Sequence, residues 1–279
     1  MADRLKDLFF SDKFFTELGT AIQGVYPEFA IRPFLQKDPE KGMYQMRRWA
    51  KDKNQHLRRL ASEGCRPRLP WAMALSGFKK DPKLIIPVLE VLKDDPSEYV
   101  RRSVANNLND ISKDHPGLVL DLCEQWLEQN KNRDWIVKRA CRSLLKAGNT
   151  RALLLFGFGD PEHIVVNNLV FDKQKLAIGD NLRFTFEMSL DTEDSFLIRL
   201  EYKVSFVKAR GKLSGKIFQI KEGSYEPGRH AISRKHSFKD LSTRKHHPGT
   251  HQISIIVNGI EKVMDKLELV YLEQKSTKQ

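Results

Sequence analysis

The sequence has no long apolar run and few cysteines. No stretch approaches the roughly 18 consecutive apolar residues of a membrane-spanning helix, and four of the first ten residues are charged, where a secretory signal would be apolar. The three cysteines, Cys65, Cys123 and Cys141, are odd in number and show no Cys-X-X-Cys spacing. We therefore expect a cytoplasmic protein without a disulfide framework, a zinc site or a membrane partner, whose cysteines pack in the interior.

The composition is that of a globular protein with a positive surplus. Of 279 residues, 40% are hydrophobic and 30% are charged, which allows a packed core and argues against disorder. Lys and Arg outnumber Asp and Glu by 48 to 36, and the net charge of +12 favours a polyanionic partner. These counts are 23 and 13 between residues 41 and 151, and 20 and 16 between residues 160 and 279, so the positive field belongs mainly to the first part.

Two periodicities divide the chain. Residues 5–156 carry apolar side chains at the three-and-four spacing of helices, as in Pro82–Leu92. From about residue 162 the pattern alternates apolar and polar residues, as in Asn181–Met188, and turn signals separate about seven or eight strands. The patterns predict a helical-repeat domain over residues 1–158, followed by an immunoglobulin-like β-sandwich over residues 159–279.

A short unit recurs in the helical part. Leu57, Val100 and Val137 each stand beside two basic residues, and their separations of 43 and 37 residues are typical of stacked helix pairs of the HEAT kind. The pairs are Arg58-Arg59, Arg101-Arg102 and Lys138-Arg139. In such an α-solenoid the second helices line a concave surface, so these pairs form a basic groove that suits a nucleic-acid duplex. Alternatively, one arginine of each pair packs its stem on the next repeat and pairs with an acid.

The β-rich part contains a basic stretch at residues 229–247, with six Lys or Arg and four His. We interpret it as a loop that either binds a DNA backbone or is basic only because the whole protein is. His246, His247 and His251 have no carboxylate or cysteine at a ligand spacing, so we expect no metal site there.

Two acidic residues, Glu63 and Asp110, fall on helices that are expected to line the basic groove. A carboxylate there repels phosphates and needs a purpose. It can be structural, if Glu63 pairs with Arg59 and Asp110 with Arg102 or Lys113. It can also be catalytic, because a fixed carboxylate stabilises the sugar cation that forms when a glycosidic bond breaks, and helps to position water. Spacing alone favours the structural role.

Three long motifs decide between these roles. They are Glu28–Phe34, His56–Trp71 and Asp94–Pro116. All three closely resemble the signature of the AlkC-type alkylbase DNA glycosylases, relatives of the AlkD enzymes within a superfamily of HEAT-like repeats. Together with the expected first helix, Leu5–Val25, the resemblance covers nearly all of the helical part.

The resemblance implies a monofunctional DNA glycosylase of base-excision repair that removes 3-methyladenine, and also 3-methylcytosine, without flipping the base and without a metal or cofactor. It also implies that Glu28, Glu63 and Asp110 are the catalytic carboxylates, that Arg59 orients them and that Trp71 lies beside the damaged nucleotide. The DNA-binding residues that we expect are Arg59, Arg66, Arg68, Trp71, Arg101, Arg102, Lys138 and Arg139. Some members carry an immunoglobulin-like domain that helps to grip DNA.

The sequence departs from the family pattern at one junction. A further block of helices is expected before the first motif, but here Val25-Tyr26-Pro27 leads straight into it. The position of Glu28 therefore depends on how this junction folds. We expect a monomer that acts on alkylated double-stranded DNA. The alternative is a non-catalytic DNA-binding repeat protein, a shortened relative that keeps the basic groove and releases no base.

Overall fold

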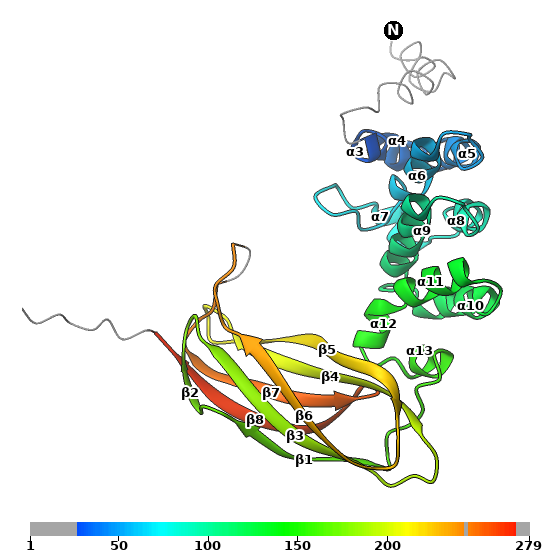
Figure 1. Cartoon of the computed structure of the whole chain (residues 1–279). Coiled ribbons are helices and arrows are strands. Elements are labelled where there is room, and N and C mark those ends of the chain that lie inside the picture. Colours follow the sequence, from blue (N-terminus) through cyan, green and yellow to red (C-terminus); the bar gives the residue numbers. More distant parts are fainter. Residues whose placement is uncertain (1–26, 243–244, 272–279) are drawn as a thin grey trace, which may run out of the picture. The chain divides into compact units, whose positions relative to one another are not determined.

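The computed structural model describes residues 27–242 and 245–271. The expected first helix, Leu5–Val25, and Arg244 of the basic stretch lie outside these residues. The chain divides into two compact units between Leu144 and Leu145. Helices form the first unit, and strands dominate the second (Figure 1).

The helices match the three-and-four periodicity of the first part. They are α3 (Pro27–Ala30), α4 (Arg32–Lys37), α5 (Pro39–Trp49), α6 (Gln55–Glu63), α7 (Ser76–Lys80), α8 (Ile86–Leu92), α9 (Glu98–Ile111), α10 (Pro116–Trp126), α11 (Lys131–Ala140), α12 (Arg142–Lys146) and α13 (Thr150–Leu155). The unit boundary runs through α12, and α13 belongs to the second unit. None of the helices seen here combines the length and the apolar character that crossing a bilayer requires.

Local capping explains where several helices begin. The side chain of Asp38 accepts a hydrogen bond from the Lys41 backbone N–H at 3.1 Å, and Pro39 occupies the first turn of α5. Asn54 caps α6 in the same way, and Asn130 caps α11 with two such bonds. Asp38 therefore separates α4 from α5.

Three helices, α6, α9 and α11, follow one another through the first unit. α9 packs against α6 on one side and α11 on the other, and α5, α8 and α10 run beside them (Figure 1). Val100, Val104 and Leu108 stand at three-and-four spacing on α9 and are fully buried. Burial of each such side chain contributes roughly 1.5–3 kcal/mol, so this face fixes α9 at the centre of the unit.

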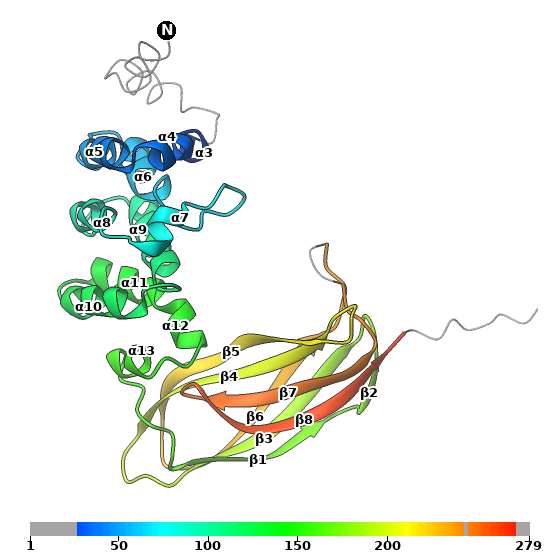
Figure 2. The ribbon, with the colours of Figure 1, turned by 180° about the vertical axis from the view of Figure 1, so that it is seen from behind.

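Eight strands are described in the second unit, which agrees with the predicted number. They are β1 (Ile164–Phe171), β2 (Lys175–Ala177), β3 (Asn181–Leu190), β4 (Phe196–Val207), β5 (Leu213–Tyr225), β6 (Gly228–Ser237), β7 (Gly249–Val257) and β8 (Ile260–Val270). One sheet has the order β1-β3-β6 and the other β2-β8-β7-β4-β5, and all neighbours are antiparallel except β2 and β8. Figure 2 shows the two sheets one behind the other.

Alternation along the strands places the core between the sheets. In β3, every second residue from Leu182 to Leu190 is buried, as the alternating sequence predicted. The interpretation of residues 229–247 as a loop was wrong for its first half, because Gly228–Ser237 is strand β6 and pairs with β3 along its length. Charged residues at an exposed sheet edge obscured the strand pattern.

Three histidines lie in the sandwich core near one end. His236, His246 and His251 surround the rings of Phe206 and Phe238, at centroid distances of 5.0–6.0 Å. The His251 ring is fully buried, and its Nε2 lies 3.0 Å from the backbone oxygen of His247. Burial, the largest cause, lowers the pKa of His251, so this ring is held in its neutral form.

Two glycines explain why α13 belongs to the second unit. Gly148 and Gly259 both have positive φ angles, 69° and 81°, and a Cβ on Gly259 would lie 2.6 Å from the Gly148 Cα. Only glycine allows the chain before α13 to approach the β7–β8 turn this closely. The domain boundary after residue 158 that the sequence suggested stays a prediction.

Candidate active site

Glu63 and Asp110 stand at the C-terminal ends of two neighbouring helices. Glu63 is the last residue of α6, and Asp110 is the last but one of α9, which packs against α6. Both are buried, with 5% and 2% of their surfaces exposed. The negative end of a helix dipole disfavours a carboxylate, and burial removes its hydration. The ionised forms therefore need cations close by.

Arg66 supplies a positive charge to both carboxylates. Its Nη1 lies 2.6 Å from Glu63 Oε1, and its Nε lies 2.9 Å from Asp110 Oδ2. The guanidinium is itself buried, at 6% exposure. Burial alone would lower the pKa of Arg66, but the charges of Glu63 and Asp110 outweigh it and raise the pKa above its usual value. One buried cation therefore joins two acids that are 47 positions apart in the sequence, at 63 and 110.

The second oxygen of Glu63 has no hydrogen-bond donor among the residues that the structure places. Its closest cation is Arg59, whose Nη2 lies 3.7 Å from Glu63 Oε2. Arg59 is fixed by Tyr99, because its guanidinium stacks 4.2 Å from the ring centroid and donates to the Tyr99 backbone oxygen at 3.3 Å. A buried acceptor without a donor costs about 1–3 kcal/mol, so this oxygen is suited to a water molecule or a substrate.

Both oxygens of Asp110 are occupied. Lys113 Nζ lies 3.2 Å from Oδ1, and Arg66 holds Oδ2. The structural partners foreseen for the two acids are thus present in Arg59 and Lys113, whereas Arg102 pairs with Glu98 at 2.6 Å instead. Asp110 is therefore placed as a fixed charge rather than as a free acceptor.

Arg32 was not recognised as important from the sequence. It is only 1% exposed, and its guanidinium donates to the backbone oxygens of Gly64, Arg66 and Met73 at 3.0, 2.9 and 2.6 Å. Burial lowers the pKa of Arg32. A lone arginine within the apolar run around Ile31 was the available signal, since a buried charge needs such partners. Arg32 fixes the backbone that carries Arg66.

The loop after Arg66 presents an exposed aromatic side chain. Trp71 is 98% exposed and has a φ of 65°, a left-handed conformation that is rare for a bulky residue. The base of the loop is fixed, because Arg68 forms a two-pronged ion pair with Asp114 at 2.6 and 3.1 Å. An exposed, strained tryptophan on a fixed base suggests a ligand contact.

The remaining basic pairs have mixed surroundings. Arg58 lies 2.6 Å from Asp95, so the alternative that one arginine of a pair binds an acid of the next repeat holds for it. Arg101 donates to the backbone oxygens of Asp95 and Pro96 at 2.6 and 2.9 Å. Lys138 is half-buried. Of the predicted DNA-binding residues, the structure brings Arg59 and Arg66 to the carboxylates, and the DNA contacts of the whole set stay a prediction.

Glu28 lies in the short helix α3, which contacts α6. Its side chain is half-buried, and no ion pair or hydrogen bond joins its carboxylate to any residue within 27–242 or 245–271. The structure therefore does not add Glu28 to the cluster of Glu63, Arg66 and Asp110, and its catalytic role stays a prediction.

Other chemistries find little support near this cluster. Burial raises the pKa of Cys65 to about 12, so this thiol next to Asn107 is not a nucleophile at neutral pH. Across the described ranges, no three residues of the His, Cys, Asp and Glu types gather in a way that could hold a metal ion. The site provides fixed charges, one buried carboxylate oxygen without a donor and an exposed tryptophan.

Comparisons with known proteins agree with this fold. A family model described as DNA alkylation repair enzyme matches residues 27–144, and a model of the C-terminal Ig-like domain of the uncharacterised protein YhaZ matches residues 165–271. The chain is 46% identical over 242 residues to the protein YhaZ of Bacillus subtilis strain 168, which covers 86% of this chain and 67% of that one.

A solved structure matches most of this chain. It is the Pseudomonas fluorescens alkylpurine DNA glycosylase AlkC bound to DNA containing an abasic site analog, 40% identical, with a TM-score of 0.84 over 88% of this chain and 68% of that one. The fold, helical first and Ig-like second, is therefore AlkC-like, as the resemblance of the motifs implied. The chain belongs to the DNA alkylation repair enzyme family.

Proposed function

We propose that the protein is a monofunctional DNA glycosylase that hydrolyses the N-glycosidic bond of cationic alkylated bases, 3-methyladenine and 3-methylcytosine among them, in base-excision repair. The observation that carries the proposal is the open oxygen of Glu63. One Glu63 oxygen is held by Arg66, and the other is buried with no donor. Such an oxygen can accept a proton from an attacking water and can face a developing positive charge.

The chemistry follows from the charge of the substrate. A base methylated at a ring nitrogen is already cationic, so it leaves with the electrons of the C1′–N bond and needs no general acid. Positive charge then develops on the sugar, where the ionised carboxylates of Glu63 and Asp110 stabilise it. Water adds at C1′, and Glu63 Oε2 takes its proton. Glu28 is the third carboxylate of this proposal, and its half-buried position on α3 next to α6 allows it to add to the same field.

The cations around the acids have a double role in this mechanism. Arg66, Arg59 and Lys113 provide positive charge beside the buried carboxylates, and Arg59 holds the orientation of Glu63. The acids in turn reduce the affinity for phosphate near the scissile bond. Discrimination against neutral bases then depends on the charge of the base and on the intrinsic lability of the damaged nucleotide. An enclosed base pocket is not needed, so this mechanism suits excision without base flipping.

We propose further that α5 with α6, α8 with α9 and α10 with α11 are HEAT-like repeats of an α-solenoid. The order of contacts α6, α9, α11 supports this assignment. Arg59, Arg68, Arg101, Arg102, Lys138 and Arg139 then face duplex DNA, and Trp71 lies beside the damaged nucleotide. The Ig-like domain adds to the grip. The protein acts as a cytoplasmic monomer on double-stranded alkylated DNA and needs no metal or cofactor.

The test is release of free base from methylated duplex DNA, resolved by chromatography, with heat-inactivated protein as the blank. We expect 3-methyladenine from the wild type and none from Asp110→Asn, whose DNA affinity is unchanged or higher because a negative charge is lost from the groove. Glu98→Gln is the matched control, since this exposed acid of α9 pairs only with Arg102. DNA binding without any base release would support the non-catalytic alternative instead.

A further inference from the structure

A buried asparagine on α9 holds the peptide group that carries Glu63. Asn107 is fully buried, and its Nδ2 donates to the backbone oxygen of Ser62 at 2.8 Å. Ser62 immediately precedes Glu63 at the end of α6, where the last carbonyl groups of a helix have no partner within the helix. Asn107 also stands about one helical turn before Asp110 on α9. One turn of α9 therefore carries one proposed catalytic acid and holds the peptide group next to the other.

A second polar contact beside Asn107 joins the same two helices. Ser62 Oγ donates to Ser103 Oγ at 2.7 Å, and both serines are fully buried. The neighbouring buried residues of α6 are apolar, Leu60 and Ala61. Apolar packing is not directional, so by itself it fixes the position of one helix along another only loosely. The hydrogen bonds from Ser62 to Ser103 and from Asn107 to Ser62 are directional and fix that position.

The amide of Asn107 is only half satisfied. Its Oδ1 is buried and has no donor in the part of the chain that the structure describes. A buried acceptor without a donor lowers stability, so an apolar side chain of similar size would serve packing alone at least as well. A single buried asparagine between two helices can fix their register at such a cost in stability. Asn107 therefore fits a positioning role better than a stabilising one.

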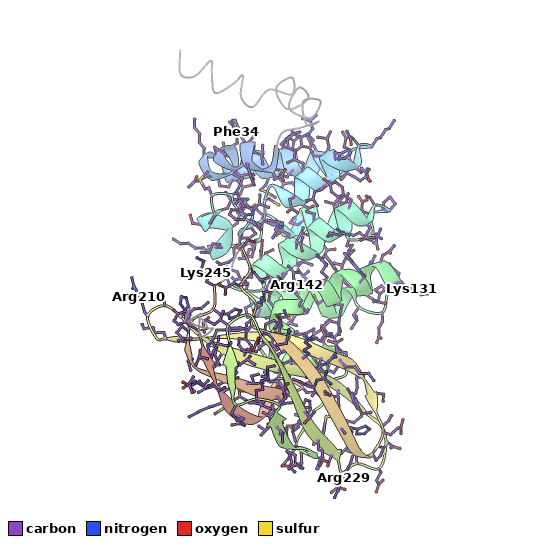
Figure 3. All side chains as sticks on the ribbon, turned by 60° about the vertical axis from the view of Figure 1, so that its left-hand side comes forward. Phe34, Lys131, Arg142, Arg210, Arg229 and Lys245 are labelled. Carbon is purple, nitrogen blue, oxygen red and sulfur yellow. The ribbon has the colours of Figure 1, made fainter. Side chains whose placement is uncertain are left out.

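Asn109 provides an internal comparison on the same helix. Its Nδ2 donates at 2.8 Å to the backbone oxygen of Ala140, the last residue of α11, and its Oδ1 accepts from Ser143 Oγ at 3.2 Å. Arg142, which Figure 3 labels, starts α12 two positions after Ala140. Asn109 thus holds a helix end with a bond of the same length, but that end belongs to α11 and not to the helix that carries Glu63.

We propose that Asn107 is a positioning residue that sets where Glu63 lies relative to Asp110, so that Arg66 can join both. The inference rests on the proposed function for the reaction that these acids perform. Arg66 lies 2.6 Å from Glu63 Oε1 and 2.9 Å from Asp110 Oδ2, and its guanidinium is planar and rigid. A shift of α6 along α9 by about 1 Å would lengthen one of these contacts and displace Glu63 from the sugar.

The experiment measures single-turnover release of 3-methyladenine from methylated duplex DNA, with the full-length protein in excess. We expect Asn107→Ala to lower the rate at saturating protein by about tenfold or more. Its affinity for undamaged duplex should not change, because no cation is altered. The matched control is Asn109→Ala, which also loses a 2.8 Å bond from α9 to a helix end. Its melting temperature should fall at least as far, whereas its rate per folded molecule should stay close to that of the wild type.

A second variant separates position from stability. Asn107→Thr nearly keeps the side-chain volume, and a threonine hydroxyl in a helix can donate to the backbone oxygen four positions earlier, here that of Ser103. We expect a melting temperature closer to the wild type than that of Asn107→Ala, but the same loss of rate, because the bond to Ser62 is missing in both. A rate that recovers together with the melting temperature overturns the proposal. Equal losses of rate in Asn107→Ala and Asn109→Ala overturn it as well.

A spectroscopic readout keeps this inference separate from the proposed function. Arg66 Nε–H donates to Asp110, so its nitrogen–proton NMR signal, assigned by its loss in Arg66→Lys, reports on the contact between the helices. The signal should move in both Asn107 variants and stay in place in Asn109→Ala. If it does so but the wild type releases no base, the positioning role stands and the glycosylase proposal falls. If base is released and the signal is unmoved in the Asn107 variants, the glycosylase proposal stands and the positioning role falls.

Discussion

Each of the two units buries an arginine that joins two acidic side chains. In the helical unit, Arg66 joins Glu63 and Asp110, and in the sandwich Arg199 joins Glu201, at 2.7 Å, and Glu222. Each cluster leaves one buried glutamate oxygen without a donor, on Glu63 and on Glu201. An open buried oxygen therefore does not identify an active site by itself.

The surroundings distinguish the two clusters. Glu201 is fully buried within a sheet. Near Glu63 and Asp110, however, Arg59 and Lys113 reach the surface, with 21% and 43% of their side chains exposed. In the sandwich, Glu222 reaches the surface to the same extent as Arg59, with 21% of its side chain exposed. The first cluster differs because it lies in the helical part that matches the DNA alkylation repair enzyme model and has two cations beside its acids. The comparison teaches that unsatisfied charge by itself does not separate a catalytic carboxylate from a structural one.

The strongest test of this comparison neutralises, in each unit, the glutamate that has a buried oxygen without a donor. Glu63→Gln should reduce base release by at least about 100-fold, because a fixed charge facing the transition state is lost. Glu201→Gln should leave the rate per folded molecule unchanged. Single-turnover excision from methylated duplex measures both, and equal losses in the two variants would contradict the comparison.

The second test removes the arginine that joins the acids within each cluster. Arg66→Leu and Arg199→Leu should each destabilise the protein by about 3–5 kcal/mol, because two buried carboxylates lose their partner. All four tryptophans, at 49, 71, 126 and 135, precede the unit boundary, so their fluorescence follows the helical unit. In urea, Arg66→Leu should shift the fluorescence transition, whereas Arg199→Leu should shift the circular dichroism signal of the strands.

Matched variants sharpen this test. Arg199→Leu combined with Glu201→Leu should recover much of the lost stability, since apolar replacement of a buried pair is often neutral. Arg66→Leu combined with Glu63→Leu can also recover stability, but it should release no base. Recovery of excision in that double variant would contradict the proposed role of Glu63.

The smallest expected effect is a pH dependence confined to the sandwich. Because the pKa of His251 is lowered in the folded state, the unfolded chain binds more protons below about pH 6.5, the usual histidine pKa. Stability is therefore full above that pH and falls as the pH drops, by at most about 1.4 kcal/mol per pH unit for one histidine. Urea transitions at pH 7.5 and 5.5 measure it, and His251→Phe should weaken the dependence. If only the transition followed by tryptophan fluorescence moved to a lower urea concentration at pH 5.5, the assignment of the effect to the sandwich would be contradicted.

Periodicity predicted the elements of the fold well. The alternation in Asn181–Met188 gave β3, and the three-and-four spacing in Pro82–Leu92 gave α8. Strand β6 was missed because basic side chains at a sheet edge do not alternate visibly in the sequence. The motifs led to Glu63 and Asp110 through their resemblance to a family, since spacing alone favoured a purely structural role.

The partners of these acids could not be predicted from the sequence. Arg66 follows Glu63 by three positions, which suggests a local pair, but its bond to Asp110 depends on how α6 packs on α9. Local sequence fixes helix faces, whereas contacts between distant segments depend on the tertiary arrangement.

The arginines that hold the loop with Trp71 have one more consequence. Arg66 and Arg68 attach the loop to Asp110 of α9 and to Asp114 just after α9, and Arg32 holds its backbone at Met73. The conformational entropy of the segment that carries Trp71 is thus lost when the protein folds, before any DNA arrives. In the proposed function, contact of the tryptophan with a nucleotide then requires little further ordering, and the interface is rigid where the acids have to be placed most accurately against the sugar.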